Sequence, residues 1–293
     1  MILTRPHPLD QGLPPKWASG WGEDQYGVFV VIVVGAVEQR LRWIPPGEFS
    51  MGSSRGEAGR HTDEIKHQVT LTRGLWLGDT PCTQALWQEI TGKNPSHFQS
   101  DQRPVEQVSW EDAKGFLGGL KGRVKGLSPR LPTEAEWEYA CRAETKRATY
   151  AGDLEILGQH NAPLLDPIAW YGGNSGVDFD LDNGADISGS LWKEKQYPEA
   201  TRAGTRIVGQ KAPNPWGLYD MLGNVLEWCE DYYGPYSKKA KTDPTGPKEG
   251  TRRVIRGGSW DGGASFVRAA FRFHWVPSLR LYDLGFRLAQ GQD

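Results

Sequence analysis

The side chains best suited to chemistry in this chain, three cysteines and six histidines, have no spacing that marks a site. Cys82, Cys141 and Cys229 are odd in number and widely separated, which disfavours a disulfide framework or a zinc site and predicts buried free thiols. The histidines include no i, i+4 pair and stand at positions 7, 61, 67, 97, 160 and 274. The sequence has no glycine-rich phosphate loop, serine nucleophile elbow or acidic metal cluster. These patterns predict that the chain is not an enzyme.

The strongest signal for binding is a set of aromatic residues near the C-terminus. Phe271, Phe273 and Trp275 alternate, so a strand would present all three on one side. Together with Phe266 and Tyr282 they predict an apolar aromatic patch of the kind that favours protein or peptide ligands. Core packing is the alternative: it stays open for Trp275, whereas exposure is favoured for Phe271 and Phe273.

Composition limits the class of protein and of partner. The 293 residues include 37 Gly, 20 Pro and 13 Trp, which predicts one loop-rich domain pinned by large aromatic side chains. A net charge of −2 without a basic run argues against a nucleic-acid partner. The apolar run 28–37 is much shorter than the roughly 20 residues of a membrane span, and residues 1–8 lack the apolar core of a signal peptide. We therefore expect a cytoplasmic protein without a membrane partner.

A few regular elements must position these residues. Residues 1–20 are rich in Pro and Gly and predict an irregular arm, whereas the β-branched residues of 26–42 predict a hairpin that turns near Gly35. Ser109 and Thr133 each precede an acidic residue in the pattern of a capping box, so a helix should follow each of them. A third helix is expected between Thr83 and Gly92. Loops should dominate 147–209.

Six blocks of sequence occur in the order found in formylglycine-generating-enzyme (sulfatase-modifying-factor) domains, which the chain resembles from about residue 40 to its end. The blocks span residues 44–52, 104–110, 130–138, 214–225, 256–260 and 285–287. The resemblance implies an α+β, C-type-lectin-like fold with small antiparallel sheets and few helices, in which the N- and C-terminal strands pair. We divide the single domain 1–293 into an arm with strands (1–40), a scaffold (41–252) and a C-terminal segment (253–293).

The departure from this family lies in its nucleophiles. Catalytic members carry two cysteines after the Gly-Gly-Ser triplet that is found here at 257–259, and they use these thiols to bind copper and the substrate cysteine. This chain has no cysteine after Cys229, and Gly262 stands where the first thiol would be. A related branch that uses iron needs a histidine cluster, which is also missing. The resemblance therefore implies a scaffold without catalysis, copper or iron.

The resemblance also implies a structural Ca²⁺ ion. In the family, a run of the form Asn/Asp-x-x-Gly-x-x-x-Glu supplies two side-chain and two backbone oxygens, which are the hard ligands that calcium prefers. The matching residues are Asp220 and Glu227 for the side chains and Gly223 and Val225 for the carbonyls. In the alternative interpretation, the two carboxylates only bond backbone amides and arginines.

Residues 261–283 resemble the variable region of diversity-generating retroelement proteins, which use the same lectin-like scaffold. There, adenine-directed mutation turns asparagine codons into a set that excludes Lys, Gln, Glu, Met and Trp. This segment contains none of the first four, and it is compatible with the set apart from its framework arginines and Trp275. The resemblance implies a ligand-binding surface, with Arg268, Arg272 and Arg287 as framework. The expected contact residues are Asp261, Gly262, Gly263, Ser265, Phe266, Phe271, Phe273, His274, Ser278, Leu279, Leu281, Tyr282 and Asp283. The alternatives are a fixed, degenerate family module and a metal-dependent oxidase of unfamiliar chemistry.

Overall fold

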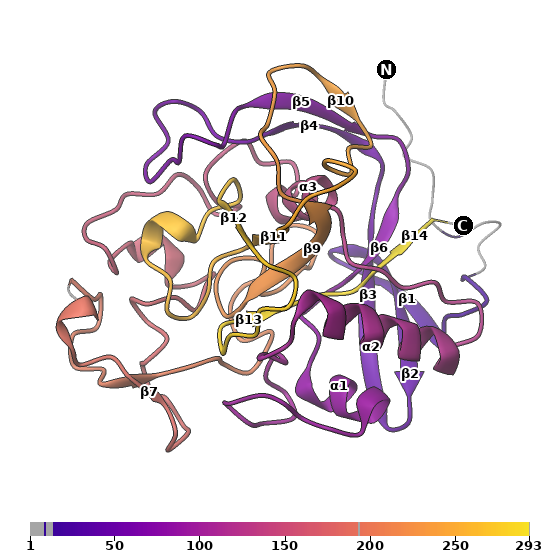
Figure 1. Cartoon of the computed structure of the whole chain (residues 1–293), viewed down its shortest axis with the longest axis horizontal. Coiled ribbons are helices and arrows are strands. Elements are labelled where there is room, and N and C mark those ends of the chain that lie inside the picture. The colour runs from indigo at the N-terminus through magenta and orange to yellow at the C-terminus, as the bar shows by residue number, and fades with distance from the viewer. Residues whose placement is uncertain (1–8, 10–13, 193, 293) are drawn as a thin grey trace.

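The computed structural model describes residue 9 and residues 14–192 and 194–292, so most of the predicted N-terminal arm lies outside the described residues. Within them, three short α-helices and four small sheets are joined by long loops, as expected for an α+β, loop-rich chain (Figure 1). The strands are β1 Gly20–Asp24, β2 Gly27–Val34, β3 Val37–Ile44, β4 Gly47–Met51, β5 His67–Leu71, β6 Leu75–Gly78, β7 Ala185–Asp186, β8 Arg202–Ala203, β9 Leu226–Tyr232, β10 Lys241–Thr242, β11 Arg253–Arg256, β12 Arg272–Trp275, β13 Leu284–Gly285 and β14 Ala289–Gly291.

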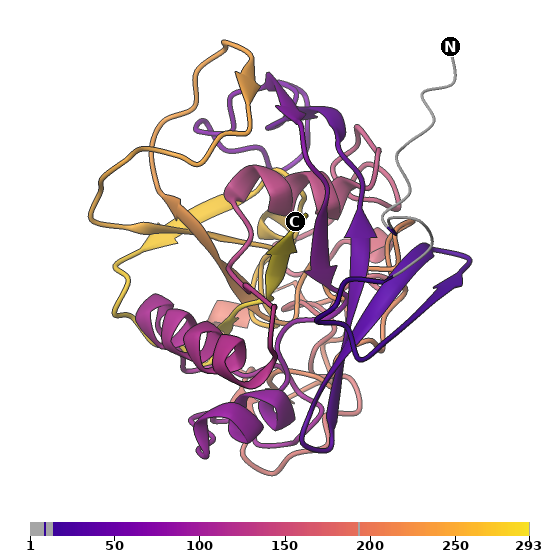
Figure 2. The ribbon, with the colours of Figure 1, turned by 90° about the vertical axis from the view of Figure 1, so that its right-hand side faces the viewer.

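The largest sheet joins the two ends of the chain. Its strand order is β1-β2-β3-β6-β14, and every neighbouring pair is antiparallel. The predicted hairpin is confirmed: β2 and β3 turn at Gly35, whose φ of 59° suits glycine. Direct pairing of the N- and C-terminal strands was wrong, because β6 lies between β3 and β14. Figure 2 shows the long strands of this sheet along one side of the molecule.

All three predicted helices are present, and each begins at the expected cap. Thr83 caps α1 (Gln84–Thr91), which ends at Gly92 in the left-handed conformation. Ser109 and Thr133 form complete capping boxes for α2 (Trp110–Arg123) and α3 (Glu134–Arg142). α1 packs against β2 and β3, and α2 packs against α1. No helix among the described residues is long and apolar enough to cross a membrane.

A four-stranded sheet in the centre of the molecule carries the C-terminal segment (Figure 1). Its order is β12-β11-β9-β13, with β11 antiparallel to both neighbours. The register places Ile255 opposite Phe273 and Val254 opposite His274. Val254 and Ile255 are fully buried, so β11 lies within the core. β12 pairs with it on one side only and forms the edge of the sheet.

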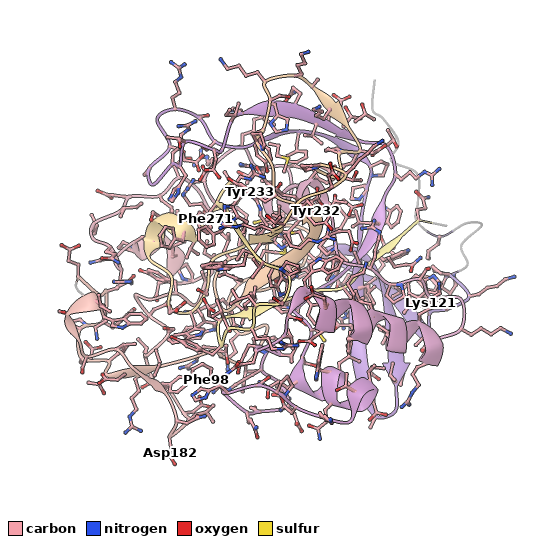
Figure 3. All side chains as sticks on the ribbon, in the orientation of Figure 1. Phe98, Lys121, Asp182, Tyr232, Tyr233 and Phe271 are labelled. Carbon is pink, nitrogen blue, oxygen red and sulfur yellow. The ribbon has the colours of Figure 1, made fainter. Side chains whose placement is uncertain are left out.

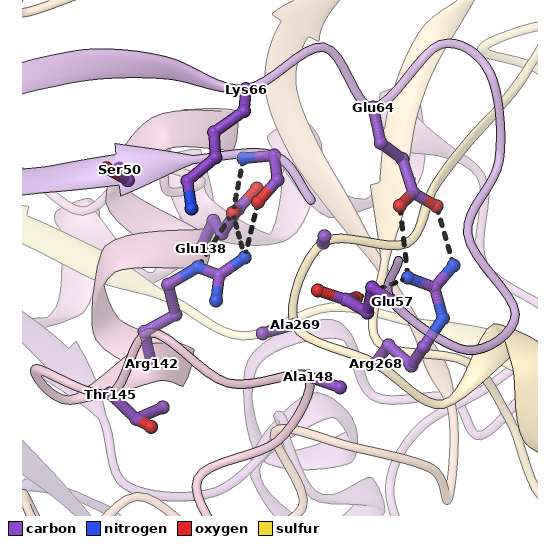
Figure 4. A network of polar contacts seen from close by, with 12 residues as sticks. Ser50, Glu57, Glu64, Lys66, Glu138, Arg142, Thr145, Ala148, Arg268 and Ala269 are labelled. Atoms are coloured by element: carbon purple, nitrogen blue, oxygen red, sulfur yellow. Dashed lines mark hydrogen bonds and ion pairs between the residues drawn. The ribbon is translucent and has the colours of Figure 1, made fainter. Parts of the chain in front are cut away.

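Four arginines of the C-terminal segment are fully buried, and each forms an ion pair with a glutamate far away in the sequence. Arg256 pairs with Glu138 at 2.5 Å, and Arg272 makes two bonds of 2.8 Å to Glu134. The other two pairs are Arg268 with Glu64 at 2.6 Å and Arg287 with Glu227 at 2.7 Å. Figure 4 shows Arg268 held between Glu57 and Glu64. A buried charge is tolerated only when it is paired in this way.

Removing one of these arginines should destabilise the fold strongly. We expect Arg287→Met to lower the free energy of unfolding by about 3–5 kcal/mol, because it leaves the buried Glu227 carboxylate without its cation. Urea unfolding measures this difference. The matched control is Arg280→Met, because Arg280 also pairs with an acid, Asp112, but its side chain is 51% exposed; its cost should stay below about 1 kcal/mol. Similar losses in the two variants would contradict the prediction.

Candidate functional site

The predicted contact segment leaves the core after β11 and returns to it at β13. It turns through a short 3₁₀ helix (Ala264–Phe266), runs along β12 and crosses a final loop. Arg268 accounts for the first turn, since its guanidinium bonds Ser265 O at 2.7 Å and Gly59 O at 2.7 Å in addition to its glutamates. Arg272 holds the start of β12 through Gly234 O at 3.0 Å. The framework role expected for these arginines thus follows from bonds to carbonyls and to buried glutamates.

The first aromatic group contains Phe266, Phe271 and Phe273, with His61 from the loop between β4 and β5. The ring centroids of Phe266 and Phe271 are 5.0 Å apart, and His61 lies 5.7 and 5.4 Å from them. Phe273 stacks on Phe271 at 6.4 Å. Phe266 and Phe273 are 38% and 40% exposed. This group therefore forms a continuous aromatic strip that is open to solvent at both ends.

The expected exposure of Phe271 was wrong. Its side chain is only 5% exposed and belongs to the hydrophobic core. Alternation with Phe273 does place the two rings on one side, but Phe271 stands just before β12, where Phe266 and His61 cover it. Trp275, for which both alternatives were open, is half-buried and packs against the same core. Phe271 is consequently the buried member of the strip, and its ring packs against the exposed rings of Phe266 and Phe273.

His274 stacks on Phe273, with the ring centroids 5.4 Å apart, and also meets residues outside the segment. Its ring lies 4.0 Å from Tyr233, and its Nδ1 lies 3.2 Å from the Arg252 guanidinium. Burial, followed by the nearby Arg252 charge, lowers the pKa of His274. The Tyr233 hydroxyl donates to Asp63 at 2.7 Å. His274 is thus half-buried, and its lowered pKa favours the neutral ring at ordinary pH.

A second aromatic group surrounds Tyr282, in the loop before β13. The Tyr282 ring is 41% exposed and lies 5.4 Å from Trp260 and 6.1 Å from Phe98. Trp192 stacks on Trp260 at 6.1 Å. Figure 3 labels Phe98 and Phe271, which belong to the two groups and are well separated in that view. The aromatic residues therefore make two patches and not the single one that the sequence predicts.

Two aspartates of the segment lie beside the second group. Asp261 accepts a hydrogen bond from Ser259 Oγ at 2.5 Å. Burial, together with the Asp261 charge, raises the pKa of Asp283 to about 8, and burial also raises the pKa of Asp261. The pair thus holds a proton at neutral pH, which makes this part of the surface less acidic than two aspartates imply.

The small residues of the segment are packed closely against the scaffold. A Cβ added at Gly263 would come within 3.0 Å of Gln159 O, and one added at Gly262 within 3.2 Å of Ser259 O. A Cβ at Gly59 would lie 2.8 Å from the Cβ of Ser265. Gly263 is buried, whereas Gly262 and Ser265 are half-exposed. Gly263 can reach a ligand only if the loop that carries Gln159 moves.

The remaining predicted residues lie in the loop between β12 and β13. Ser278 is exposed, while Leu279 and Leu281 are half-buried. Arg280 ties this loop to the start of α2 through two bonds to Asp112, of 2.7 and 2.9 Å. Leu281 packs against the core. The structure therefore brings Leu279 and Leu281 to the surface only in part.

The residues predicted to bind calcium are bonded to protein groups. Both oxygens of Glu227 accept from Arg287, and one also accepts from Trp137 Nε1 at 2.7 Å. Asp220 accepts from the Gly209 amide at 2.7 Å, and burial raises the pKa of Asp220 to about 6. This arrangement corresponds to the alternative in which the carboxylates bond amides and arginine. Calcium here stays a prediction.

The three cysteines are free and buried, as predicted. Burial raises the pKa of Cys141 to about 12 and places the pKa values of Cys82 and Cys229 well above the usual range. Among the described residues, no group of three or more His, Cys, Asp or Glu side chains is arranged to hold a metal ion. The described thiols are thus poorly placed for nucleophilic chemistry, which requires the thiolate.

Residues 36–292 match the family of the sulfatase-modifying factor enzyme 1-like domain, and the chain belongs to this family. The mouse formylglycine-generating enzyme is 31% identical over 240 residues, which are 79% of this chain and 56% of the mouse protein. The inactive Cα-formylglycine-generating enzyme 2 of cattle is 29% identical over 78% of this chain and 64% of its own. The chain spans little more than half the length of the mouse relative.

A comparison with a solved structure supports the same fold. Variable protein 1 of Treponema denticola superimposes with a TM-score of 0.70 and 29% identity, covering 89% of this chain and 98% of that one. The C-type-lectin-like fold and both resemblances drawn from the sequence are confirmed.

Sequence reasoning missed the residues that flank the segment. His61 lies 200 positions and Tyr233 28 positions before residue 261. Neither carried a motif, yet they contact Phe266, Phe271 and His274. The only signal was indirect: His61 lies in the charged loop whose Glu64 pairs with Arg268. If each arginine of segment 261–283 had been assumed to pair with a glutamate, the loop that carries His61 would have been predicted to lie beside this segment.

Removal of calcium distinguishes the two interpretations of Asp220 and Glu227. Because amide, indole and guanidinium donors already occupy the carboxylates, we expect excess EGTA to leave the melting temperature unchanged. Differential scanning calorimetry with EGTA and with added Ca²⁺ measures this. A calcium-dependent rise that disappears in Asp220→Asn would instead support the ion, since only binding to the folded state stabilises it.

Proposed function

We propose that this chain is a non-catalytic receptor that binds a protein or peptide through residues 261–283, and that a retroelement diversifies this segment. The observation that supports the proposal best is that the buried ion pairs of the scaffold are present while the catalytic cysteines are missing. All four buried arginines of the C-terminal segment keep buried glutamate partners, whereas no cysteine follows Cys229. Such a scaffold keeps the ion pairs that its buried charges require, but it lacks the cysteines that the catalytic members of the family use.

The surface chemistry supports a protein or peptide ligand. Phe266, Phe273 and Tyr282 are large aromatic side chains with about 40% exposure each, and such residues dominate the energetics of protein interfaces. Arg252 and His274 add hydrogen-bonding groups at the edge of the first aromatic group. Aromatic contacts of this size favour an apolar side chain in the partner over a sugar or a nucleic acid. We further propose a cytoplasmic location and no direct contact with a membrane.

The likeness to Treponema denticola variable protein 1 supports variation of the segment, because that protein shares the fold over nearly its whole length. Thirteen residues are proposed as contacts, and most are at least partly exposed. Phe271 and Gly263 are buried, so variation at these two positions must act through the packing beneath the surface.

The second candidate is a fixed, non-catalytic module of the same family. The 29% identity to an inactive enzyme of cattle favours it, because a degenerate domain with an invariant segment would also lose the thiols. An oxidase of unfamiliar chemistry remains a third alternative, in which copper or iron would have to bind without the family's ligands.

Sequencing of the gene in sister isolates tests the diversified receptor. We expect substitutions to cluster in codons 261–283, to change adenine-derived positions, and to spare the codons of Arg268, Arg272 and Arg280. A template repeat and a reverse transcriptase should lie nearby. The control region is the codons for residues 214–225, which should be invariant. An invariant C-terminal segment without a template would favour the fixed module.

Catalysis is tested directly on the purified protein. We expect a cysteine-containing sulfatase peptide to remain unoxidised after incubation with copper, because the described thiols are buried and their pKa values are raised. Mass spectrometry of the peptide detects formylglycine by its loss of sulfur. A catalytic relative assayed in parallel is the positive control. Turnover by this chain that disappears in Cys229→Ala would contradict the non-catalytic assignment.

A further inference from the structure

A cavity of about 380 Å³ lies on the side of β12 that faces away from the aromatic strip. Its walls come from the end of β9, the start of α3, the beginning of β5, and the loop that arches from residue 234 to residue 247. Met51, Ala135, Pro235 and Pro247 supply most of the apolar lining. A volume of this size lies at the lower end of the range for small-molecule sites.

The wall of the cavity includes a tyrosine, Tyr236, whose hydroxyl no described protein group satisfies. The hydroxyl oxygen of Tyr236 is buried and has no hydrogen-bond partner among the described residues. The His67 ring packs against Tyr236 with the ring centroids 4.8 Å apart, and His67 Nδ1 is engaged with Ile65 O at 2.9 Å. Leaving a buried hydroxyl unpaired is unfavourable, so a ligand group that bonds it would be favoured.

A second polar group in the wall is the Asp231 carboxyl. Its only bond among the described residues is from the Glu134 amide, at 2.9 Å. Burial, followed by the charge of Glu134, raises the pKa of Asp231 to about 8. At neutral pH this carboxyl is therefore protonated, and it offers the cavity a hydroxyl donor and a carbonyl acceptor.

The charges around the cavity are already balanced. Arg272 and Glu134 make two bonds of 2.8 Å, and the Arg272 guanidinium lies 3.7 Å from the centre of the Tyr236 ring. Arg272 and Glu134 largely neutralise each other, so a charged ligand would lose its hydration without gaining an unpaired counter-charge from either of them. Lys241 also lines the cavity, but it is exposed to solvent, so water weakens the effect of its charge. The electrostatics thus favour an uncharged occupant.

We propose that this cavity binds an uncharged small molecule with an apolar body about the size of an aromatic ring and one hydroxyl or amide group. The polar group of the ligand bonds the Tyr236 hydroxyl and the Asp231 carboxyl, and the ring lies against Met51 and the two prolines. This site uses none of the contact residues of segment 261–283, so it does not depend on the proposed function.

Three probes of nearly equal size test the proposal: benzyl alcohol, benzylammonium and benzoate. Titrations followed by ¹H–¹⁵N NMR at pH 7 should show benzyl alcohol binding with a dissociation constant of about 1–10 mM, with the largest shifts at the amides of 234–247. The two charged probes should bind at least about tenfold more weakly, because neither finds a free counter-charge. Equal binding of the three, or preference for a charged probe, would overturn the proposal.

Two variants locate the contact. Tyr236→Phe removes the unsatisfied hydroxyl and should weaken benzyl alcohol about fivefold or more, since one hydrogen bond contributes about 1 kcal/mol. Tyr197→Phe is the matched control, because its hydroxyl bonds Asp166 elsewhere on the surface, and it should leave the affinity unchanged. Asp231→Asn keeps an uncharged polar group and should also retain binding. Loss of binding in Asp231→Asn, or none in Tyr236→Phe, would refute the assignment.

Discussion

The structure depends above all on ion pairs between buried arginines of the C-terminal segment and glutamates of the earlier chain. Glu64 lies in the loop after β4, Glu134 and Glu138 lie in α3, and Glu227 lies in β9. Each pair closes a distance of 60 to more than 200 residues in the sequence. A chain with long loops and few helices has little regular hydrogen bonding to fix its topology, and these charge pairs supply that constraint.

The same ion pairs fix the backbone of the C-terminal segment independently of its exposed side chains. Arg268 and Arg272 fix the backbone on either side of Phe271, and Arg280 fixes the next loop by a bond to α2. Side chains between the anchors contribute little to the fold when they point outward, as Phe266 and Phe273 do. Substitution at such positions changes what the surface contacts without disturbing the charge pairs beneath it.

Local features could be predicted from the sequence because short-range physics decides them. The caps at Thr83, Ser109 and Thr133 and the turn at Gly35 follow from hydrogen bonding and backbone geometry within a few residues. The framework and the missing thiols were likewise visible in motifs. The order of the motifs along the chain therefore predicts the fold family, which the comparisons confirm.

Long-range packing could not be predicted in the same way. The exposure of Phe271 depends on where β12 begins and on His61, which lies 210 positions earlier. The division of the aromatic residues into two groups depends on Phe98 and Trp192, which no periodicity connects to Tyr282 or Trp260. The partners of Glu227 likewise come from α3 and from the end of the chain. Such contacts are properties of the assembled core and not of any window of sequence.

The loop of residues 54–66 has an evolutionary consequence. Exposed loops ordinarily tolerate insertions and deletions, but Arg268 binds this one at Glu57, Gly59 and Glu64. Gly59 touches Ser265, and His61 covers Phe271. A change in loop length would displace all of these contacts together. Natural selection should therefore preserve the length of this loop as strictly as that of a core strand, even while the residues facing it diverge.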